Sequence, residues 1–283
     1  MASSVRSAQA ITVRPGEHAC CHFADADDRE RVAFAFVRDG LQRGDKVVYF
    51  ADTDAAGPMT SGLDPAFEPA IARGQLEVRS ADDAYLPDGR FEPDRMLAML
   101  RAEQERALAE GYLGLSVTGE MPTALSELPG SRQLGSYEAQ IASDMDAASC
   151  SILCQYDHGR FGPGVLSDVV EAHEIDASPE LAAIGRDGEL AAARDRRHGA
   201  LRLAGELDFG CAQTLSEVLD AHFHGPLRLD LADLSYVDVA GMRALRGRTG
   251  QRLTIAPASN AVRRLLALLA WDTDPAIELL EGA

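Results

Sequence analysis

The sequence has a single lysine, Lys46, and an odd number of cysteines, five, among its 283 residues. An odd cysteine count in a chain of this length does not fit the disulfide framework of a small secreted domain. Long apolar runs are also absent, since none approaches the roughly 20 residues that a membrane-spanning helix needs. The first residues lack the apolar core of a signal peptide. We therefore expect a cytoplasmic protein that does not enter a membrane.

Positive charge is scarce as well, because 27 basic residues stand against 45 acidic ones and give a formal net charge of −18. A field of this sign repels phosphate backbones, so we expect no direct binding to nucleic acid and favour basic partners. The hydrophobic fraction of 46% is typical of a globular protein. A length of 283 residues suffices for two domains, each with its own core.

Strand-like and helix-like segments alternate in the first part of the chain, from residue 11 to residue 175. Apolar runs of buried-strand length are found at 18–23, 46–52, 112–121 and 149–157. Amphipathic helices are predicted at 27–43, 90–111, 131–147 and 162–174, the first opened by a capping box of Asp27 and Glu30. This alternation predicts an α/β domain, with a mostly parallel sheet covered by helices.

The composition changes at residues 176–198, which are rich in alanine, charge and glycine and show little apolar periodicity. We predict a linker there, in part helical. From residue 199 to residue 283, strand-like and helix-like segments alternate again and predict a second, smaller α/β domain. The predicted organisation is thus a domain at 11–175, a linker at 176–198 and a domain at 199–283.

Two motifs mark the second domain. Gly-Glu-Leu-Asp at 205–208 ends one strand, and Asp238-Val239-Ala240-Gly241 forms the turn between a later strand and a helix. Together they resemble the STAS domain, the fold of anti-sigma-factor antagonists. The resemblance covers almost the whole of this domain. It implies that an anti-sigma factor or a related ATP-binding kinase domain binds at the turn formed by Asp238, Val239, Ala240 and Gly241.

One feature of the turn departs from the STAS pattern. Phosphorylated members carry Ser or Thr directly after the aspartate, where a phosphate adds about −2 of charge at the start of a helix. Val239 and Ala240 follow Asp238 in this sequence, and neither has a hydroxyl group. We therefore expect partner binding that does not use the usual phosphorylation switch. The alternative is a degenerate domain that only dimerises or docks.

The first domain resembles the MEDS family of sensory domains, which are often fused to signalling modules. The resemblance rests on the segment at 17–52 and, in order along the chain, on LGLSVTGEM, YEAQI and CQYDHGRFGP. It spans residues 11–175. It implies an input module joined to the STAS-like output module. The two resemblances are compatible with a homodimer, but the sequence does not fix the oligomeric state.

The same layout also resembles a RecA-type core that has lost its nucleotide site. A P-loop needs glycine-rich backbone donors and a lysine that reaches the phosphates. The segment after the first strand reads HFADADDRER, which is acidic and has no glycine, and Lys46 lies at the start of the next strand. The sequence therefore predicts a RecA-like sheet without a P-loop, and ATP is not an expected ligand.

Open parallel sheets bind ligands beyond the carboxyl ends of their strands. The predicted strand ends and the segments near them bring together side chains that suit a small polar ligand: His22, Asp52, Glu120, Tyr137, Glu138, Tyr156, Asp157 and Arg160. The alternative for each residue is a helix cap or a solvated strand end. We interpret the set as a candidate crevice for a small molecule whose identity the sequence does not reveal.

The stretch His18-Ala19-Cys20-Cys21-His22 has the composition of a metal site. In a strand, His18, Cys20 and His22 share one face over about 13 Å, too far apart for all three to reach one zinc ion. Cys150 and Cys154 can complete a site only if their strand is the neighbour; otherwise the cysteines are buried small hydrophobes. The metal ligands therefore stay unassigned, with His18 and Cys20 as weak candidates.

His18 also matches a characteristic histidine of the MEDS pattern, and the resemblance gives it a role as a ligand contact, a haem ligand or a metal ligand. A histidine satisfied by backbone carbonyls is the alternative.

The main hypothesis is a non-enzymatic signalling regulator in which a ligand or cofactor controls a STAS-type partner. The second is a haem or redox sensor that uses His18 and nearby cysteines. The third is an enzyme with Glu120 and Asp157 as acid and base, although the sequence has no nucleophile–base motif.

Overall fold

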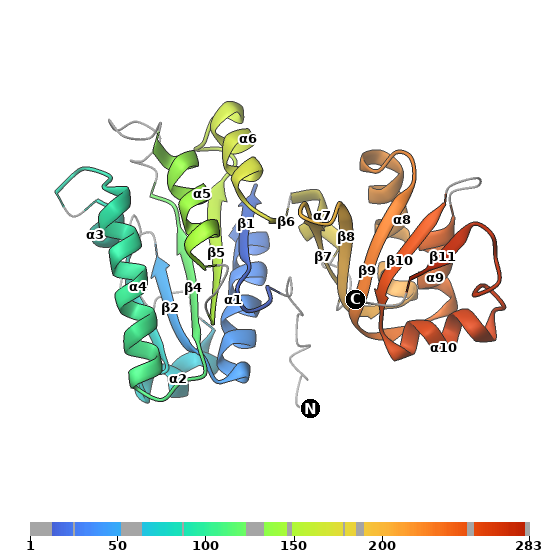
Figure 1. Cartoon of the computed structure of the whole chain (residues 1–283), viewed down its shortest axis with the longest axis horizontal. Coiled ribbons are helices and arrows are strands. Elements are labelled where there is room, and N and C mark those ends of the chain that lie inside the picture. The colour runs from blue at the N-terminus through green and yellow to red at the C-terminus, as the bar shows by residue number, and fades with distance from the viewer. Residues whose placement is uncertain are drawn as a thin grey trace. The chain divides into compact units, whose positions relative to one another are not determined.

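The computed structural model describes residues 13–24, 26–51, 64–86, 88–122, 133–145, 149–177, 179–184, 190–247 and 252–280. The chain divides into two compact units, one from Val13 to Asp176 and one from Ala177 to the end of the chain. Both are α/β units, as the sequence predicts, and they are described separately (Figure 1). No helix in the described ranges is long and apolar enough to cross a membrane.

The N-terminal unit is built on a sheet with the strand order β6-β1-β5-β4-β2-β3 among the described residues. The β1–β5, β5–β4, β4–β2 and β2–β3 pairs are parallel. The strands are β1 (His18–Phe23), β2 (Lys46–Ala51), β3 (Leu76–Ser80), β4 (Leu115–Glu120), β5 (Cys150–Asp157) and β6 (Ile175–Ala177). The strand predicted at 18–23 therefore lies beside the strand predicted at 149–157.

Helices cover both faces of this sheet (Figure 1). They are α1 (Ala26–Arg43), α2 (Glu68–Ala72), α3 (Ala81–Tyr85), α4 (Pro93–Ala109), α5 (Leu134–Met145) and α6 (Pro163–Ala172), with a 3₁₀ turn at Pro65–Phe67. Alternation along β2 separates two cores: Val48 and Phe50 pack with residues of α4, α5 and α6, whereas Val47 and Tyr49 pack with residues of α1 and α2. The α5–α6 face and the α1 face are therefore distinct chemical environments.

The C-terminal unit has a parallel set of strands, β8, β9, β10 and β11, with β7 antiparallel to β8. The strands are β7 (Leu190–Asp195), β8 (Ala200–Leu207), β9 (Leu227–Val237), β10 (Leu253–Ala258) and β11 (Ile277–Leu279). The helices are α7 (Pro179–Ile184), α8 (Phe209–His222), α9 (Val239–Arg246) and α10 (Asn260–Leu268). One apolar core joins strands and helices of this unit.

The segment that the sequence assigns to a linker contains two regular elements, α7 and β7. Leu190 and the alanines that follow it are buried and pair with β8. A strand buried on both faces reads as a continuous run of small apolar residues rather than as an alternation, so it gave no periodic signal. The structure thus places Leu190–Asp195 inside the folded C-terminal unit.

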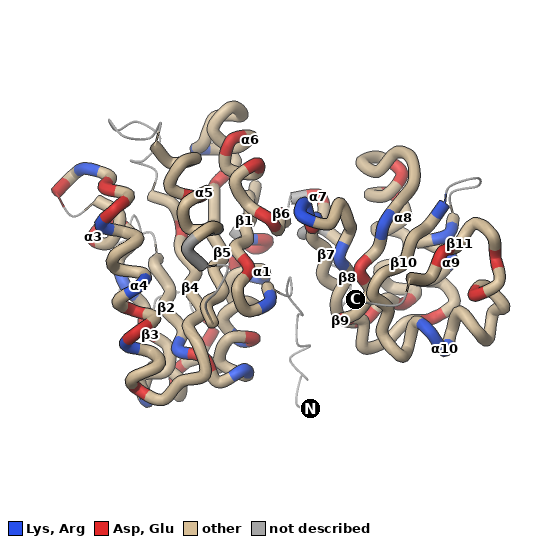
Figure 2. The backbone as a smooth tube through the Cα atoms, in the orientation of Figure 1, with Lys and Arg blue, Asp and Glu red and all other residues tan. Residues whose placement is uncertain are grey.

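Charge is distributed over the whole protein rather than confined to one unit. Acidic side chains occur along both units with basic ones interleaved among them (Figure 2). Within the N-terminal unit the interleaving includes ion pairs, such as that of the only lysine, Lys46, with Glu77 and Glu110 at 2.7 and 2.8 Å. Lys46 is therefore a buried member of an ion-pair network with two partly exposed glutamates.

Candidate functional site

Four side chains that can ligate metals meet on the α5–α6 face of the N-terminal sheet. His18 comes from the start of β1, Cys154 from β5, Glu138 from α5, and His173 from the residue directly after α6. One ligand atom from each of them lies within 4.8 Å of the corresponding atom of every other. All four residues are buried, with 3% or less of their surface exposed. We call these residues the buried cluster.

The local sequence explains why these side chains point inward. On β1 and β5 the register pairs Cys20 with Cys154, so alternate residues of both strands share the α5–α6 face. In α6, Leu166 and Val169 are buried, and His173 continues this row at the next helical step. In α5, Glu138 is buried directly beside Tyr137. The cluster is thus formed where the apolar faces of two helices cover two neighbouring strands.

Glu138 is the hub of the buried cluster. Its Oε2 atom lies 3.2 Å from His18 Nε2, 3.5 Å from His173 Nε2 and 3.7 Å from the Cys154 sulfur. His18 Nε2 is also 3.3 Å from the Cys154 sulfur. The other carboxylate oxygen, Oε1, accepts a 2.5 Å hydrogen bond from the Tyr156 hydroxyl. Oε1 is therefore hydrogen-bonded to a residue outside the cluster, and Oε2 faces the ligand atoms of His18, Cys154 and His173.

The tautomer of His173 follows from its backbone contact. Its Nδ1 atom lies 2.7 Å from the carbonyl oxygen of Val169, which can only accept, so Nδ1 carries the proton. The Nε2 lone pair then points into the cluster, where Nε2 has no hydrogen-bond donor among the described residues. His18 Nδ1 is likewise buried without a hydrogen-bond partner in this part of the chain. Two buried ring nitrogens are thus left unsatisfied by the protein.

The burial of the cluster fixes the charge states of its members. Desolvation lowers the pKa of His18 to about 3 and that of His173 to about 4, so both imidazoles are neutral at pH 7. Burial, the largest effect on each, raises the pKa of the Glu138 carboxyl and of the Cys154 thiol. A neutral imidazole is the form of histidine that ligates metals.

The rest of β1 has other partners. The Cys20 sulfur lies 3.7 Å from Asp176 Oδ1, and His22 Nε2 lies 3.2 Å from the same oxygen. The His22 ring stacks on that of His158 at a centroid distance of 6.2 Å. The row of His18, Cys20 and His22 therefore divides between two places, and only His18 belongs to the buried cluster.

The residues predicted to line a crevice at the strand ends do not converge on one site. Glu120 accepts hydrogen bonds from the Tyr49 hydroxyl at 2.6 Å and from Arg29 at 2.9 Å, on the α1 face. Because Glu120 is in register with Gln155, the next residue, Tyr156, points to the opposite face. Strand alternation thus separates Glu120 from Tyr156.

The other predicted contacts have local roles in the structure. Asp157 pairs with Arg160 at 3.1 Å and accepts from the backbone nitrogen of Gly159 in an exposed turn. Tyr137 is buried and packs edge-on against Phe91. Asp52 lies outside the described residues. Of the residues predicted near the ligand, His18, Glu138 and Tyr156 are the three that the structure brings together at the buried cluster.

One residue of the buried cluster, His173, was missed by the sequence reasoning, whereas Glu138 was expected near the strand ends together with Tyr137. Glu138 stands in the YEAQI segment beside the predicted Tyr137, and its burial follows from the helical face it shares with that core residue. His173 ends the row of buried residues in α6, at a position where an apolar side chain would be expected. The sequence signal that could have identified His173 was a histidine at a position of the helix where the other residues of the same row are apolar.

In the C-terminal unit the turn at Asp238 joins two helix starts. Asp238 caps α9 by accepting from Gly241 N at 2.8 Å, and its other oxygen accepts from Phe209 N, at the start of α8, at 3.0 Å. A Cβ atom at Gly241 would lie 2.5 Å from the carbonyl oxygen of Leu207. Gly241 is therefore required for the close approach of α9 to the end of β8.

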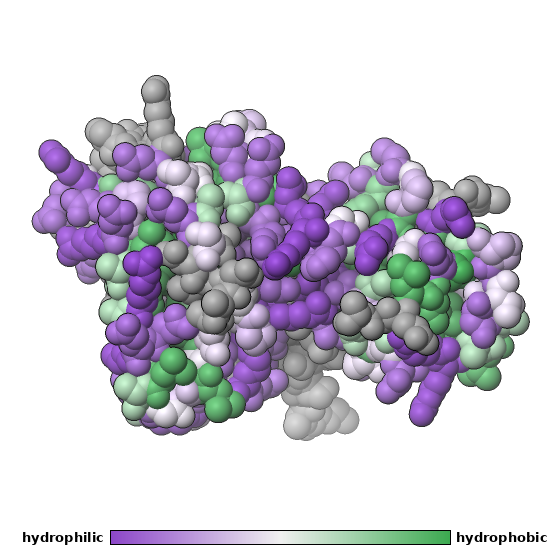
Figure 3. All heavy atoms as spheres, viewed as in Figure 1, coloured by the Kyte–Doolittle hydropathy of each residue, from purple (hydrophilic) through white to green (hydrophobic). Residues whose placement is uncertain are grey.

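Apolar side chains are exposed around this turn. Phe209 is 80% exposed, Tyr236 49% and Val239 37%. They come from the start of α8, the end of β9 and the start of α9, which the hydrogen bonds of Asp238 hold together. Figure 3 shows an apolar area on the visible face of the C-terminal unit. The turn presents an apolar surface with a fixed backbone.

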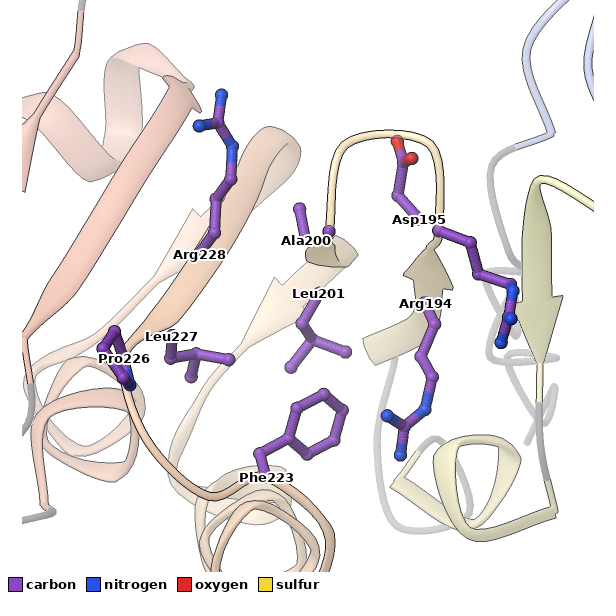
Figure 4. A pocket seen from close by; sticks show the side chains of 10 residues that line it. Arg194, Asp195, Ala200, Leu201, Phe223, Pro226, Leu227 and Arg228 are labelled. Carbon is purple, nitrogen blue, oxygen red and sulfur yellow. The ribbon is translucent and has the colours of Figure 1, made fainter.

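A hollow of about 340 Å³ lies near the opposite ends of β8 and β9 (Figure 4). Three arginines line it, namely Arg194, Arg196 and Arg228. The Arg194 guanidinium lies 4.3 Å from the centroid of the Phe223 ring, and Asp195 is held by Arg202. The hollow is cationic, but Arg194 and Asp195 are engaged by contacts within the unit, and we assign it no ligand.

Comparison with known families agrees with this organisation. The family model described as the methanogen/methylotroph DcmR sensory domain, MEDS, matches residues 17–174. The chain belongs to the MEDS family. A second model, described as the Mlab STAS domain, matches residues 190–281, so a MEDS domain is followed by a STAS domain, as the sequence predicts. The combination of a sensory-family domain and a STAS domain is that of a signalling regulator.

The flagellar accessory protein FlaH from Methanocaldococcus jannaschii is a similar solved structure. It shares 12% sequence identity with this chain and superposes with a TM-score of 0.35, over 59% of this chain and 72% of the other. No curated protein matches the sequence significantly. The family assignment therefore rests on the two domain models, and the buried cluster belongs to the MEDS domain.

Proposed function

We propose that this protein is a cytoplasmic signalling regulator. Its MEDS domain senses a small ligand or cofactor, and its STAS domain binds a protein partner of the anti-sigma-factor or ATP-binding kinase type. The observation that carries the proposal is the pairing of a sensory-family domain with a STAS domain whose turn at Asp238 is held rigidly and exposes apolar side chains.

The chemistry of the turn supports a switch other than phosphorylation of the family position. Val239 and Ala240 have no hydroxyl group to accept a phosphate. The change of about −2 in charge that a phosphate gives at a helix start is therefore unavailable there. Control of the partner then has to come from the rest of the chain. A ligand of the MEDS domain can supply it by favouring one of two states of the full protein.

The two catalytic carboxylates of the enzyme hypothesis have separate partners. Glu120 is bound by Tyr49 and Arg29, and Asp157 is bound by Arg160 and the turn at Gly159. Paired carboxylates act as acid and base only when both reach one substrate. We therefore propose a role in regulation and none in catalysis.

The proposal predicts that a charge in the turn abolishes partner binding. Val239→Asp places a carboxylate in the exposed apolar surface, where a partner would have to desolvate it. We expect the full chain to capture an anti-sigma factor or a kinase-type protein from its native host, and Val239→Asp to lose it at least about tenfold, the effect of roughly 1.4 kcal/mol. The measurement is quantitative mass spectrometry of captured proteins.

Leu268→Asp is the matched control, because Leu268 is 82% exposed on α10 and lies outside the turn. This variant should capture the partner as the unmodified chain does. Capture of no such partner by the unmodified chain, with or without added metals and host metabolites, would count against the proposal. Equal losses in the two variants would show that the effect is not specific to the turn.

A further inference from the structure

We infer that His18, Glu138, Cys154 and His173 bind a single divalent transition-metal ion, and that zinc is the ion that fits them best. The inference builds on the proposed function, since it names the chemistry of the sensory domain. Metal binding is measured on the purified chain alone, so its failure would leave the partner binding of the STAS domain standing.

Four of the six distances between ligand atoms of the buried cluster are close to those of a tetrahedral site, and the other two are no longer than 4.8 Å. Zinc lies about 2.0–2.3 Å from nitrogen, oxygen and sulfur ligands, and ligand atoms on such a tetrahedron are roughly 3.3–3.8 Å apart. The contacts of Glu138 Oε2 with His18 Nε2, His173 Nε2 and the Cys154 sulfur are 3.2, 3.5 and 3.7 Å. The contact of His18 Nε2 with the same sulfur is 3.3 Å. A single ion can therefore reach all four ligand atoms with only small movements of the side chains.

The outer contacts of the cluster orient its ligands. His173 donates from Nδ1 to the Val169 carbonyl, which leaves the Nε2 lone pair directed inward. The Tyr156 hydroxyl donates to Oε1 of Glu138 and leaves Oε2 free to face the same centre. A histidine that ligates a metal commonly donates a hydrogen bond from its second ring nitrogen to a backbone carbonyl. A ligating carboxylate commonly accepts a hydrogen bond at its other oxygen. His173 and Glu138 thus have the outer contacts expected of metal ligands, whereas His18 Nδ1 has no hydrogen-bond partner among the described residues.

Lone pairs outnumber donors inside the cluster. His173 Nε2 has no hydrogen-bond donor among the described residues, although the residue is fully enclosed. A buried acceptor without a partner is costly and rare in folded proteins. An ion at the centre would be bound by the Nε2 lone pair together with those of Glu138, Cys154 and His18. The unsatisfied nitrogen is therefore explained by a ligand of positive charge.

The charge balance also favours a divalent ion. On binding the ion, Cys154 and Glu138 release their protons to solvent, so a thiolate and a carboxylate carry two negative charges and the two neutral imidazoles carry none. One divalent cation makes the site neutral, which suits a place where all four residues have 3% or less of their surface exposed. Two nitrogens, one sulfur and one oxygen are ligands that zinc accepts in tetrahedral geometry. Ligand atoms this close together leave no space for the macrocycle of a haem.

The position of His173 relates the site to the rest of the chain. His173 is the first residue after α6, and the N-terminal unit ends at Asp176, three residues later in the sequence. A metal bound by His173 would tie this connection to β1, β5 and α5 at once. Binding and loss of the ion would therefore change the mobility of the segment that follows α6, just before the STAS domain begins.

The test is metal analysis of the full chain purified without chelators, followed by replacement with cobalt(II). We expect one zinc per chain by elemental analysis and native mass spectrometry. The cobalt-loaded chain should show the strong visible absorption of a tetrahedral site and a near-ultraviolet thiolate-to-cobalt band. Cys154→Ser should lose that band and bind zinc more than about 100-fold more weakly.

Cys20→Ser is the matched control, because Cys20 is equally buried and in register with Cys154 but contacts Asp176. It should keep both the metal and the thiolate band. A folded chain that takes up neither zinc nor cobalt from an equimolar solution would overturn the inference. So would a thiolate band that survives in Cys154→Ser, or a Soret band of bound haem. If Cys154→Ser does not fold, the cobalt spectrum of the unmodified chain decides alone.

Discussion

Arg202→Met is expected to lower the free energy of unfolding of the C-terminal unit by about 3–5 kcal/mol, because it breaks a buried ion pair. Arg202 is 2% exposed and donates to Asp195 Oδ2 at 2.8 Å. Its Nε atom lies 3.5 Å from Asp230 on the neighbouring strand. Without the guanidinium, the buried carboxylates of Asp195 and Asp230 would both lose the positive charge that lies beside them. Urea unfolding followed by the fluorescence of Trp271, the only tryptophan, measures this unit directly.

Arg243→Met provides the comparison, since Arg243 is exposed on α9. We expect its effect to stay within about 0.5 kcal/mol. A triple variant, Arg202→Met with Asp195→Asn and Asp230→Asn, should recover much of the loss because no charge is then buried alone. If Arg202→Met were as stable as Arg243→Met, the buried pair would contribute nothing and the account of this core would be wrong.

Tyr156→Phe is expected to weaken zinc binding 10–100-fold, the range of roughly 1.4–2.7 kcal/mol seen when an outer hydrogen bond to a metal ligand is removed. The hydroxyl lies 2.5 Å from Oε1 of Glu138 and is its contact outside the cluster. The substitution keeps the buried ring, which packs edge-on against Phe161, so the fold should persist. Competition with a chromogenic chelator measures the affinity.

Tyr49→Phe is a control of the same chemistry at another place. Tyr49 donates to Glu120 Oε1 at 2.6 Å on the α1 face, so the variant also removes a buried tyrosine–glutamate hydrogen bond. It should leave zinc binding unchanged. If Tyr156 has only a structural role, the two variants should have the same zinc affinity. If its hydroxyl positions the Glu138 carboxylate, only Tyr156→Phe should bind zinc more weakly.

The sequence predicted the fold class and the order of the two domains because these depend on local signals. Apolar runs marked β1, β2, β4 and β5, and the glycine-containing motif at 205–208 together with the turn at Asp238 marked the STAS domain. Two strands gave weak signals. β3 (Leu76–Ser80) is short and only partly buried beyond Leu76, and β7 is rich in alanine. Neither has the long alternation that distinguishes a strand from a loop.

The buried cluster could be predicted only in part, since it joins residues far apart in the sequence. His18 was identified, and Cys154 was recognised as useful if its strand lay beside β1, which it does. Glu138 and His173 depend on how α5 and α6 cross that pair of strands, and no short motif records the crossing. Glu120 and Tyr156 were expected together because both lie near strand ends, but side-chain alternation sends them to opposite faces.

The candidate site in the structure thus lies in the interior of the MEDS domain and not in a crevice at the strand ends. A closed metal site of this kind would stabilise the fold in which it forms, because the ligands are assembled only in the folded state. It would also make that stability depend on the metal available. Under the proposed metal site, binding and loss of the ion would change the mobility of the chain around His173, and this change would be the signal.

The most direct test of the central claim is whether the state of the MEDS domain sets binding by the STAS domain. Zinc-loaded and chelator-stripped full-length protein should be compared for capture of the anti-sigma or kinase-type partner, with Val239→Asp as the measure of binding that does not involve the turn. We expect recoveries that differ by at least about fivefold, the effect of roughly 1 kcal/mol of coupling between two sites. Equal recovery from the loaded and stripped protein, with the Val239→Asp loss intact, would contradict the claim that this domain is the sensor.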